Sequence, residues 1–216
     1  MSEAKRDAMH SKLASTLGRR DEQPNMDLAN ALCANENADE VAAVCEILQN
    51  GNSAAKSDAI KVLYETGRMK PQLIKRHISV FLETMNVKDN RLVWGALTAL
   101  AAVSKVAPQE VFDQLSSILK AADNGSVIAK DQAVEILIEL KKLDGFAAKM
   151  TPFLMDSLRS AAVNQLPMYA ERISAVLNSE DRAIFCEILT SRLDEHMKQS
   201  KQKRLVKVIR TVESAK

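Results

Sequence analysis

The chain has 216 residues, enough to bury a sizeable core, and 46% of them are hydrophobic, which argues against global disorder. Its 30 basic and 28 acidic residues nearly cancel to a formal net charge of +2, so bulk charge does not indicate a polyanionic partner. Only six Gly and five Pro interrupt the sequence and aromatic residues make up 4%, so we expect helix nearly throughout, with an aliphatic core.

The cysteines and the N-terminus exclude several protein classes. Cys33, Cys45 and Cys186 are odd in number and show no CxxC spacing, which argues against a disulfide framework and against a zinc site. Charged residues stand where a signal peptide needs an apolar run, and no window approaches the roughly 18 consecutive apolar residues of a membrane helix. We therefore expect a soluble cytoplasmic protein without a metal ion, a cofactor or a membrane partner.

The first 25 residues differ from the rest. Their apolar residues are sparse, namely Met9, Leu13 and Leu17, and they predict either a short helix over 8–17 or a loosely ordered segment. A break is expected from Gly18 onward. The remaining 26–216 are predicted to form a single repeat domain.

Five helical hairpins are predicted in that domain from apolar residues spaced by three and four. A last helix over 202–214 carries an apolar stripe on one side and is expected to cap the stack. Pro152 is expected to begin the second helix of the fourth hairpin, because proline is well tolerated in a first turn. The predicted hairpins are 26–34 with 38–49, 53–67 with 71–85, 90–121 with a break at Ala107-Pro108, 127–143 with 146–158, and 167–178 with 181–197.

These hairpins repeat with a period near 37. When the sequence is shifted by that amount, equivalent residues of successive hairpins align in columns. Two columns hold residues typical of a buried core, and one holds prolines. In the fifth hairpin Glu171 and Ser174 fall in columns that are otherwise apolar, so its first helix is expected to rotate slightly. The aligned residues are Ala59, Ala96, Ala133 and Ala170, then Leu63, Leu100 and Leu137, and finally Pro71 and Pro108.

One hairpin cannot bury both of its apolar stripes alone, so neighbouring hairpins must stack. Two helices in a period near 37 resemble the HEAT and armadillo repeats, and the run 89–93, the Ala-Leu pairs after it and Pro108 resemble a HEAT motif. The resemblance covers roughly 26–214. It implies an all-α fold, a right-handed α-α superhelix (solenoid) of about five hairpins plus a C-terminal capping helix. The alternative is an unrelated helical bundle with chance self-similarity.

Catalytic signatures are absent from the sequence. His10, His77 and His196 are far apart, and none stands in a metal-ligand pattern such as HExxH. Nucleophile and phosphate-loop motifs such as GxSxG and GxxxxGK[ST] do not occur. We therefore predict a protein that is not an enzyme and that has no catalytic residue.

Trp94 is a candidate anchor for a partner. Its repeat column also holds Ser57, Asp131 and Met168, so the column is not a core column. Tryptophan is enriched in binding hot spots, which favours an interaction role for an exposed indole. The other interpretation is that Trp94 packs along the groove of its own hairpin.

The C-terminal helix carries the main charge asymmetry of the chain. Arg204, Lys207 and Arg210 lie away from its apolar stripe and could meet phosphates or an acidic partner. The alternative is that these three cations are only solvated and are favourably placed near the helix C-terminus, which explains their position about as well.

The resemblance implies a non-enzymatic scaffold that binds a protein partner on a concave face lined by the second helix of each hairpin. Polar candidates on those helices are Lys75, Arg76, Gln114 and Glu187. The alternative is a nucleic-acid-binding protein related to the alkylpurine DNA glycosylases, which are also built from HEAT-like repeats. The near-neutral charge and the single Trp favour the protein scaffold, so nucleic acid is the less favoured partner.

Overall fold

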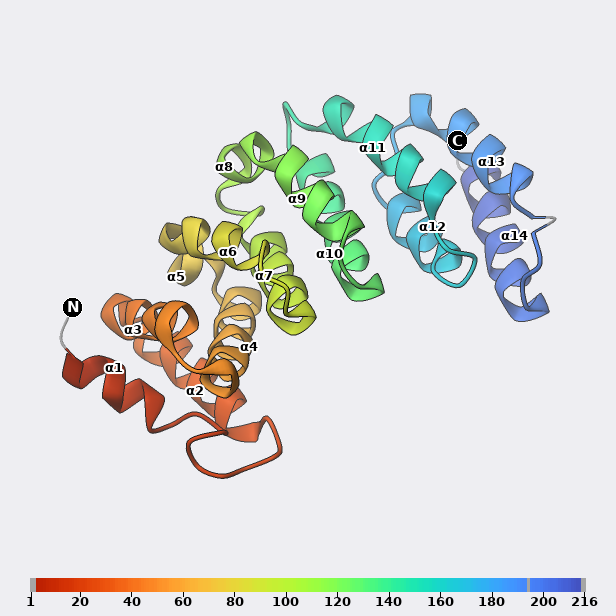
Figure 1. Cartoon of the computed structure of the whole chain (residues 1–216). Helices are drawn as coiled ribbons and strands as arrows, with labels where there is room; N and C mark the ends of the chain where they lie inside the picture. The colour runs from red at the N-terminus through yellow and green to blue at the C-terminus, as the bar shows by residue number, and fades with distance from the viewer. Residues whose placement is uncertain (1–2, 194, 215–216) are drawn as a thin grey trace. The chain divides into compact units, whose positions relative to one another are not determined.

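Helices make up the regular structure of residues 3–193 and 195–214, the part of the chain described by this computed structural model (Figure 1). Several begin at a polar N-cap: Asn52 accepts a hydrogen bond from Ala55 N–H, and Asp89 accepts from Arg91 and Leu92 N–H. Asn52 and Asp89 are one predicted period apart, so this start signal recurs with the repeat.

The elements, in order, are α1 Glu3–His10, α2 Gln23–Asn35, α3 Ala38–Asn50, α4 Ser53–Met69, α5 Pro71–Ile74, the 3-10 turn η1 Lys75–His77, α6 Ile78–Thr84, α7 Asn90–Val103, α8 Pro108–Asp113, α9 Leu115–Asp123, α10 Val127–Lys141, α11 Ala147–Ser160, α12 Leu166–Ser174, the 3-10 turn η2 Ser179–Asp181, α13 Arg182–Ser191 and α14 Gln199–Ser214.

The chain divides into two compact units inside α10, one ending at Ile136 and one beginning at Leu137. In the first unit, α2, α4 and α7 form one layer, and α1, α3, α5, α6, α8 and α9 form the other (Figure 1). In the second unit, α12 packs beside α14 and α11 packs beside α13. Whether 26–216 behaves as one cooperative domain stays a prediction.

The predicted core columns are confirmed. Ala59, Ala96, Ala133 and Ala170 are all buried, and so are Leu63, Leu100 and Leu137. The small residues allow close packing, which is clearest between α4 and α7. A Cβ at Gly95 would lie 2.6 Å from Cγ1 of Ile60, closer than real Cβ contacts allow. The hydrogen atom of Gly95 therefore lets α7 approach α4.

The N-terminal segment is better ordered than its sequence predicts. The helix expected over 8–17 is wrong: α1 runs from Glu3 to His10, followed by turns. Met9 and Leu13 are nevertheless buried, while Leu17 is 54% exposed. Because α1 packs on α3, this segment covers the first hairpin.

The second helices of the second and third hairpins are broken where continuous helices were expected. His77 and Gln114 are one period apart, have φ of −109° and −104°, and immediately precede α6 and α9. Pro152 lies one period after Leu115, yet α11 begins at Ala147 and continues through it. The expected start at Pro152 is therefore wrong. Met150 and Leu154 lie on opposite sides of Pro152 and are both fully buried, so their packing keeps α11 continuous.

The last helices confirm the cap and correct the ends of the fifth hairpin. Leu205, Val208, Ile209 and Val212 are the buried face of α14, as predicted. Helices α12 and α13 are shorter than the predicted 167–178 and 181–197, and residue 194 of the latter range lies outside the described residues. Tyr169, Ala170 and Ile173 belong to the buried face of α12 and leave Glu171 exposed. Ala170 stays in its buried column, so the helix keeps the register of the other repeats and the expected rotation is not needed.

Candidate functional site

Trp94 lies on α7 against an aromatic neighbour on α4. The rings of Tyr64 and Trp94 have centroids 5.5 Å apart and planes inclined by 50°. Tyr64 is buried, whereas Trp94 is half-buried. The other members of the Trp94 column, Ser57, Asp131 and Met168, are half-buried as well. The indole is thus fixed by packing on one side while part of its surface remains open to solvent.

Two cations lie over the Tyr64 ring. Lys61 Nζ is 5.0 Å from the ring centroid, and the guanidinium carbon of Arg68 is 5.1 Å from it. Glu65 accepts from Lys61 at 2.8 Å and from Arg68 at 3.0 Å. The aromatic pair is therefore bordered on α4 by two cations that share one carboxylate.

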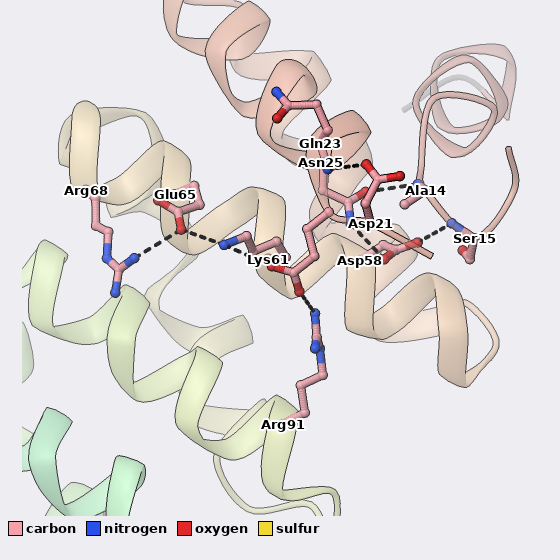
Figure 2. Close-up of polar contacts among 11 residues, drawn as sticks. Ala14, Ser15, Asp21, Gln23, Asn25, Asp58, Lys61, Glu65, Arg68 and Arg91 are labelled. Atoms are coloured by element: carbon pink, nitrogen blue, oxygen red, sulfur yellow. Dashed lines mark hydrogen bonds and ion pairs between the residues drawn. The ribbon is translucent and has the colours of Figure 1, made fainter. Parts of the chain in front are cut away.

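Glu22, just before α2, extends this network to α7. It pairs with Lys61 at 3.2 Å and with Arg91, so the charges alternate from Arg68 through Glu65, Lys61 and Glu22 to Arg91. Figure 2 shows this line crossing from α4 to α7. We refer to these five residues as the charge ladder.

Two members of the charge ladder have perturbed pKa values. Burial raises the pKa of Glu22, but hydrogen bonds from Arg91 and Lys61 outweigh it and leave that pKa below its ordinary value. Burial lowers the pKa of Lys61, but hydrogen bonds with Glu65, Tyr64 and Glu22 outweigh it and raise that pKa. Both groups are therefore charged at neutral pH. A charged, paired lysine is unsuited to act as a base or a nucleophile.

A second polar cluster fastens the N-terminal turns to α4. Asp58 accepts from Ser15 N–H at 2.7 Å and from Asn25 Nδ2 at 2.7 Å. Asn25 Oδ1 in turn accepts from Ala14 N–H at 3.0 Å, as Figure 2 shows. Asn25 and Asp58 are both buried, so this cluster is structural and explains the order of the N-terminal turns.

The remaining candidates of the first unit lie on the broken second helices. Lys75 and Arg76 belong to η1 and Gln114 precedes α9, in the layer that does not contain Trp94. Arg76 and Gln114 are exposed and Lys75 is half-buried. Burial, with a smaller contribution from Arg76, lowers the pKa of His77 beside them. The structure does not bring these residues together with Trp94 into one site.

Glu187 lies in a groove of the second unit. A hollow of about 450 Å³ between the end of α11 and α13 is lined by Arg159, Ile184, Glu187, Ile188, Ser191 and Arg192, together with Glu195. Arg192 donates to the carbonyls of Leu158 and Ala161, the latter at 2.8 Å, and thereby caps the C-terminus of α11. Glu187 itself is exposed.

The three cationic candidates of α14 do not share one role. Arg204 forms a bidentate pair with Glu171 of α12, through Nε at 2.7 Å and Nη2 at 2.5 Å. This pair lowers the pKa of Glu171 and raises that of Arg204. Lys207 and Arg210 are exposed, and the side chain of neither forms a hydrogen bond or an ion pair with any described residue. Arg204 therefore links α14 to α12 through an ion pair.

Sequence reasoning missed the charge ladder, the Asp58 cluster and one buried ion pair. In the second unit, Lys141 on α10 donates to Thr151 Oγ1 and to Asp181, and its side chain is 1% exposed. Within α4, the i, i+4 and i, i+3 spacings of Lys61, Glu65 and Arg68 are a local signal that could have predicted their pairing. The other pairs join different segments of the chain and occupy columns of mixed type, so the sequence carries no such signal for them. Among the described residues, no group of three or more His, Cys, Asp or Glu side chains is arranged to hold a metal ion.

No family model and no curated protein matches the chain. The structure, by contrast, is similar to solved repeat proteins. An engineered protein aligns over 98% of both chains with a TM-score of 0.64 and 16% identity. A designed armadillo repeat protein, solved in complex with the peptide (KR)4, aligns over 96% of this chain and 100% of its own, with a TM-score of 0.64 and 15% identity.

A natural protein is among these neighbours. The archaeal HEAT-like repeats protein from Thermococcus onnurineus NA1 aligns over 99% of this chain and 98% of its own, with a TM-score of 0.51 and 13% identity. The fold is thus that of the armadillo and HEAT-like repeats, as the sequence resemblance predicted. The number of repeats and their period stay predictions. None of the described helices has the length and apolar character needed to span a membrane.

Proposed function

We propose that this chain is a non-enzymatic repeat protein that binds a protein partner through the face of α4 and α7 around Trp94. The observation that carries the proposal is the half-buried indole, held against Tyr64 at a centroid distance of 5.5 Å. An aromatic side chain that is already fixed loses little conformational freedom when a partner covers it. Fixed, partly exposed tryptophans are typical anchors of protein interfaces.

The charge ladder supports a protein partner over a nucleic acid. Its five members alternate in sign and are paired with one another, so this face offers no uncompensated cationic track for phosphates. The structural neighbours are repeat scaffold proteins, and one of them holds a peptide, which is consistent with peptide binding by this fold. Lys75, Arg76, Gln114 and Glu187 remain candidates for further contacts.

The proposal is tested by quantitative capture of partners from the source cells on wild-type protein and on Trp94→Ala. Phe153→Ala is the matched control, because Phe153 is an aromatic residue of the other unit that is 40% exposed. Partners bound at a hot spot should weaken by about 30-fold or more with Trp94→Ala, equivalent to 2 kcal/mol, and be unchanged by the control. An equal partner profile for all three proteins would overturn the proposal.

The single Trp gives a second readout. Acrylamide should quench the fluorescence of Trp94 to an intermediate degree, and an added partner should reduce that quenching. A salt titration with a generic DNA duplex separates the nucleic-acid alternative, because phosphate contacts produce a steep dependence of affinity on salt. Tight duplex binding with such a slope would favour that alternative.

A further inference from the structure

The outward face of α14 forms a second surface, independent of Trp94. Its opposite face is fixed, because Leu205, Val208, Ile209 and Val212 are buried where α14 packs on α12 and α13. Figure 1 shows α14 beside these two helices. The residues that point away must therefore face solvent or a partner.

The basic residues of α14 fall into two groups, those whose side chains are paired within the unit and those whose side chains are not. Lys201 donates to Asn164 Oδ1, and Arg204 is paired with Glu171, so both are held within the unit. Lys203, Lys207 and Arg210 are exposed, and their side chains form no hydrogen bond or ion pair with a described residue, although the charge of Lys207 contributes to the lowered pKa of Glu171. We refer to these three residues as the outer stripe.

The outer stripe has the spacing of one helix face. Its members follow at i, i+4 and i+7, so they lie in a row about 10 Å long on α14. Gln202, Val206 and Thr211 flank them on the same helix. Half-buried Val206 lies beside this row and, with the aliphatic stems of the lysines, gives the face an apolar strip.

We propose that the outer stripe binds an acidic, amphipathic helix of a partner protein. A helix with carboxylates at i, i+4 and i+7 presents them at the same spacing, and an apolar residue between them would cover Val206. This resembles the pairing of flanking charges along packed helices. A phosphate backbone would match the charges but would leave the apolar strip uncovered.

The test uses the full chain and a synthetic helical peptide with Glu at i, i+4 and i+7 and Leu at i+3, measured by fluorescence anisotropy. The charge-reversed variant is Lys203→Glu, Lys207→Glu and Arg210→Glu. The matched control is Lys88→Glu, Lys120→Glu and Lys130→Glu, which changes the net charge equally at exposed residues of the first unit. Circular dichroism and the urea midpoint establish that both variants are folded.

We expect the charge-reversed variant to bind the peptide about tenfold or more weakly and the control to bind as the wild type does. Replacing the Leu of the peptide by Ser should weaken binding further. Equal loss in both variants, or no measurable binding by the wild type, would overturn the proposal. Preferential binding of a DNA duplex or of vesicles containing phosphatidylserine, lost in the charge-reversed variant alone, would assign the outer stripe to phosphates and would also overturn it.

Discussion

The α4–α7 contact of the first unit and the α12–α14 contact of the second show two ways of joining neighbouring repeats. Between α4 and α7, Ala59, Ala96 and Gly95 keep the helices close, and apolar side chains fill the contact. Between α12 and α14, the apolar column is interrupted by Glu171, which pairs with Arg204. At the α4–α7 contact the repeat columns stay apolar and the charge ladder lies beside the packed side chains; at the α12–α14 contact an ion pair stands in a column that is otherwise apolar.

Two other contacts of the second unit are polar as well. Arg192 caps α11 through its guanidinium, and buried Lys141 pairs with Asp181 and Thr151. In the first unit, the Asp58 cluster is placed at the edge, where the N-terminal turns meet α4. The comparison implies that losing apolar packing and losing an ion pair should cost different amounts of unfolding free energy, and four experiments measure these costs.

Removing α14 should have the largest effect. Truncation after Ser200 exposes the surface that Leu205, Val208, Ile209 and Val212 cover. Losing four buried apolar side chains corresponds to about 6–12 kcal/mol, comparable with the net stability of a small domain. We expect loss of cooperative unfolding of the second unit, measured by urea denaturation and amide hydrogen exchange. The charge reversal of the outer stripe is the control and should leave the midpoint nearly unchanged; similar damage from both would show that those cations are packed.

Leu100→Ala should be the most damaging single substitution in the apolar contact of the first unit. Leu100 is fully buried on α7, and truncating such a leucine costs about 2–5 kcal/mol of unfolding free energy. Urea unfolding monitored by Trp94 fluorescence measures it, because Trp94 lies on the same helix. Leu17→Ala, at a residue that is 54% exposed, should change little. A midpoint unchanged by Leu100→Ala would contradict the repeat assignment.

Lys141→Met should cost about 3 kcal/mol, because it leaves the Asp181 carboxylate, whose side chain is 15% exposed, without its cation. Adding Asp181→Leu should recover most of that loss, since a buried ion pair can be replaced by apolar side chains. Urea midpoints of the single and double variants give the comparison. If the double variant were as unstable as Lys141→Met, the pair would have a role beyond charge compensation.

Arg204→Ala should have the smallest effect, about 0.5 kcal/mol, because both partners are largely exposed. The Arg204 pair lowers the pKa of Glu171, so its stabilisation is complete above the ordinary glutamate pKa and is lost as pH falls through the lowered value. The difference between wild type and Arg204→Ala should therefore shrink below about pH 4. Lys207→Ala is the control and should show a smaller pH-dependent difference.

The apolar periodicity of single helices predicted the buried face of α14, and the repeat of the sequence predicted the fold class and the Ala59 and Leu63 columns. It could not predict where a helix breaks, because the break at His77 and the continuation through Pro152 depend on packing against neighbouring repeats. Trp94 was singled out because its column varies, and it proved half-buried. The pairs of Lys61, Glu65 and Arg68 could have been predicted from their helical spacing, whereas Glu22 with Arg91 and Lys141 with Asp181 are brought together only by the folded chain.

Several contacts between neighbouring repeats have similar chain separations. Asn25 and Asp58 are 33 residues apart, as are Glu171 and Arg204, while Gln49 and Glu83 are 34 apart. Each of these three contacts needs only the next repeat to be present, whereas Glu22 and Arg91 are 69 residues apart. Contacts of short range favour rapid folding. At about 5–20 residues per second, a ribosome supplies the 34 residues for the next such contact in roughly 2–7 s. The protein can thus assemble from its N-terminus during synthesis, one repeat at a time.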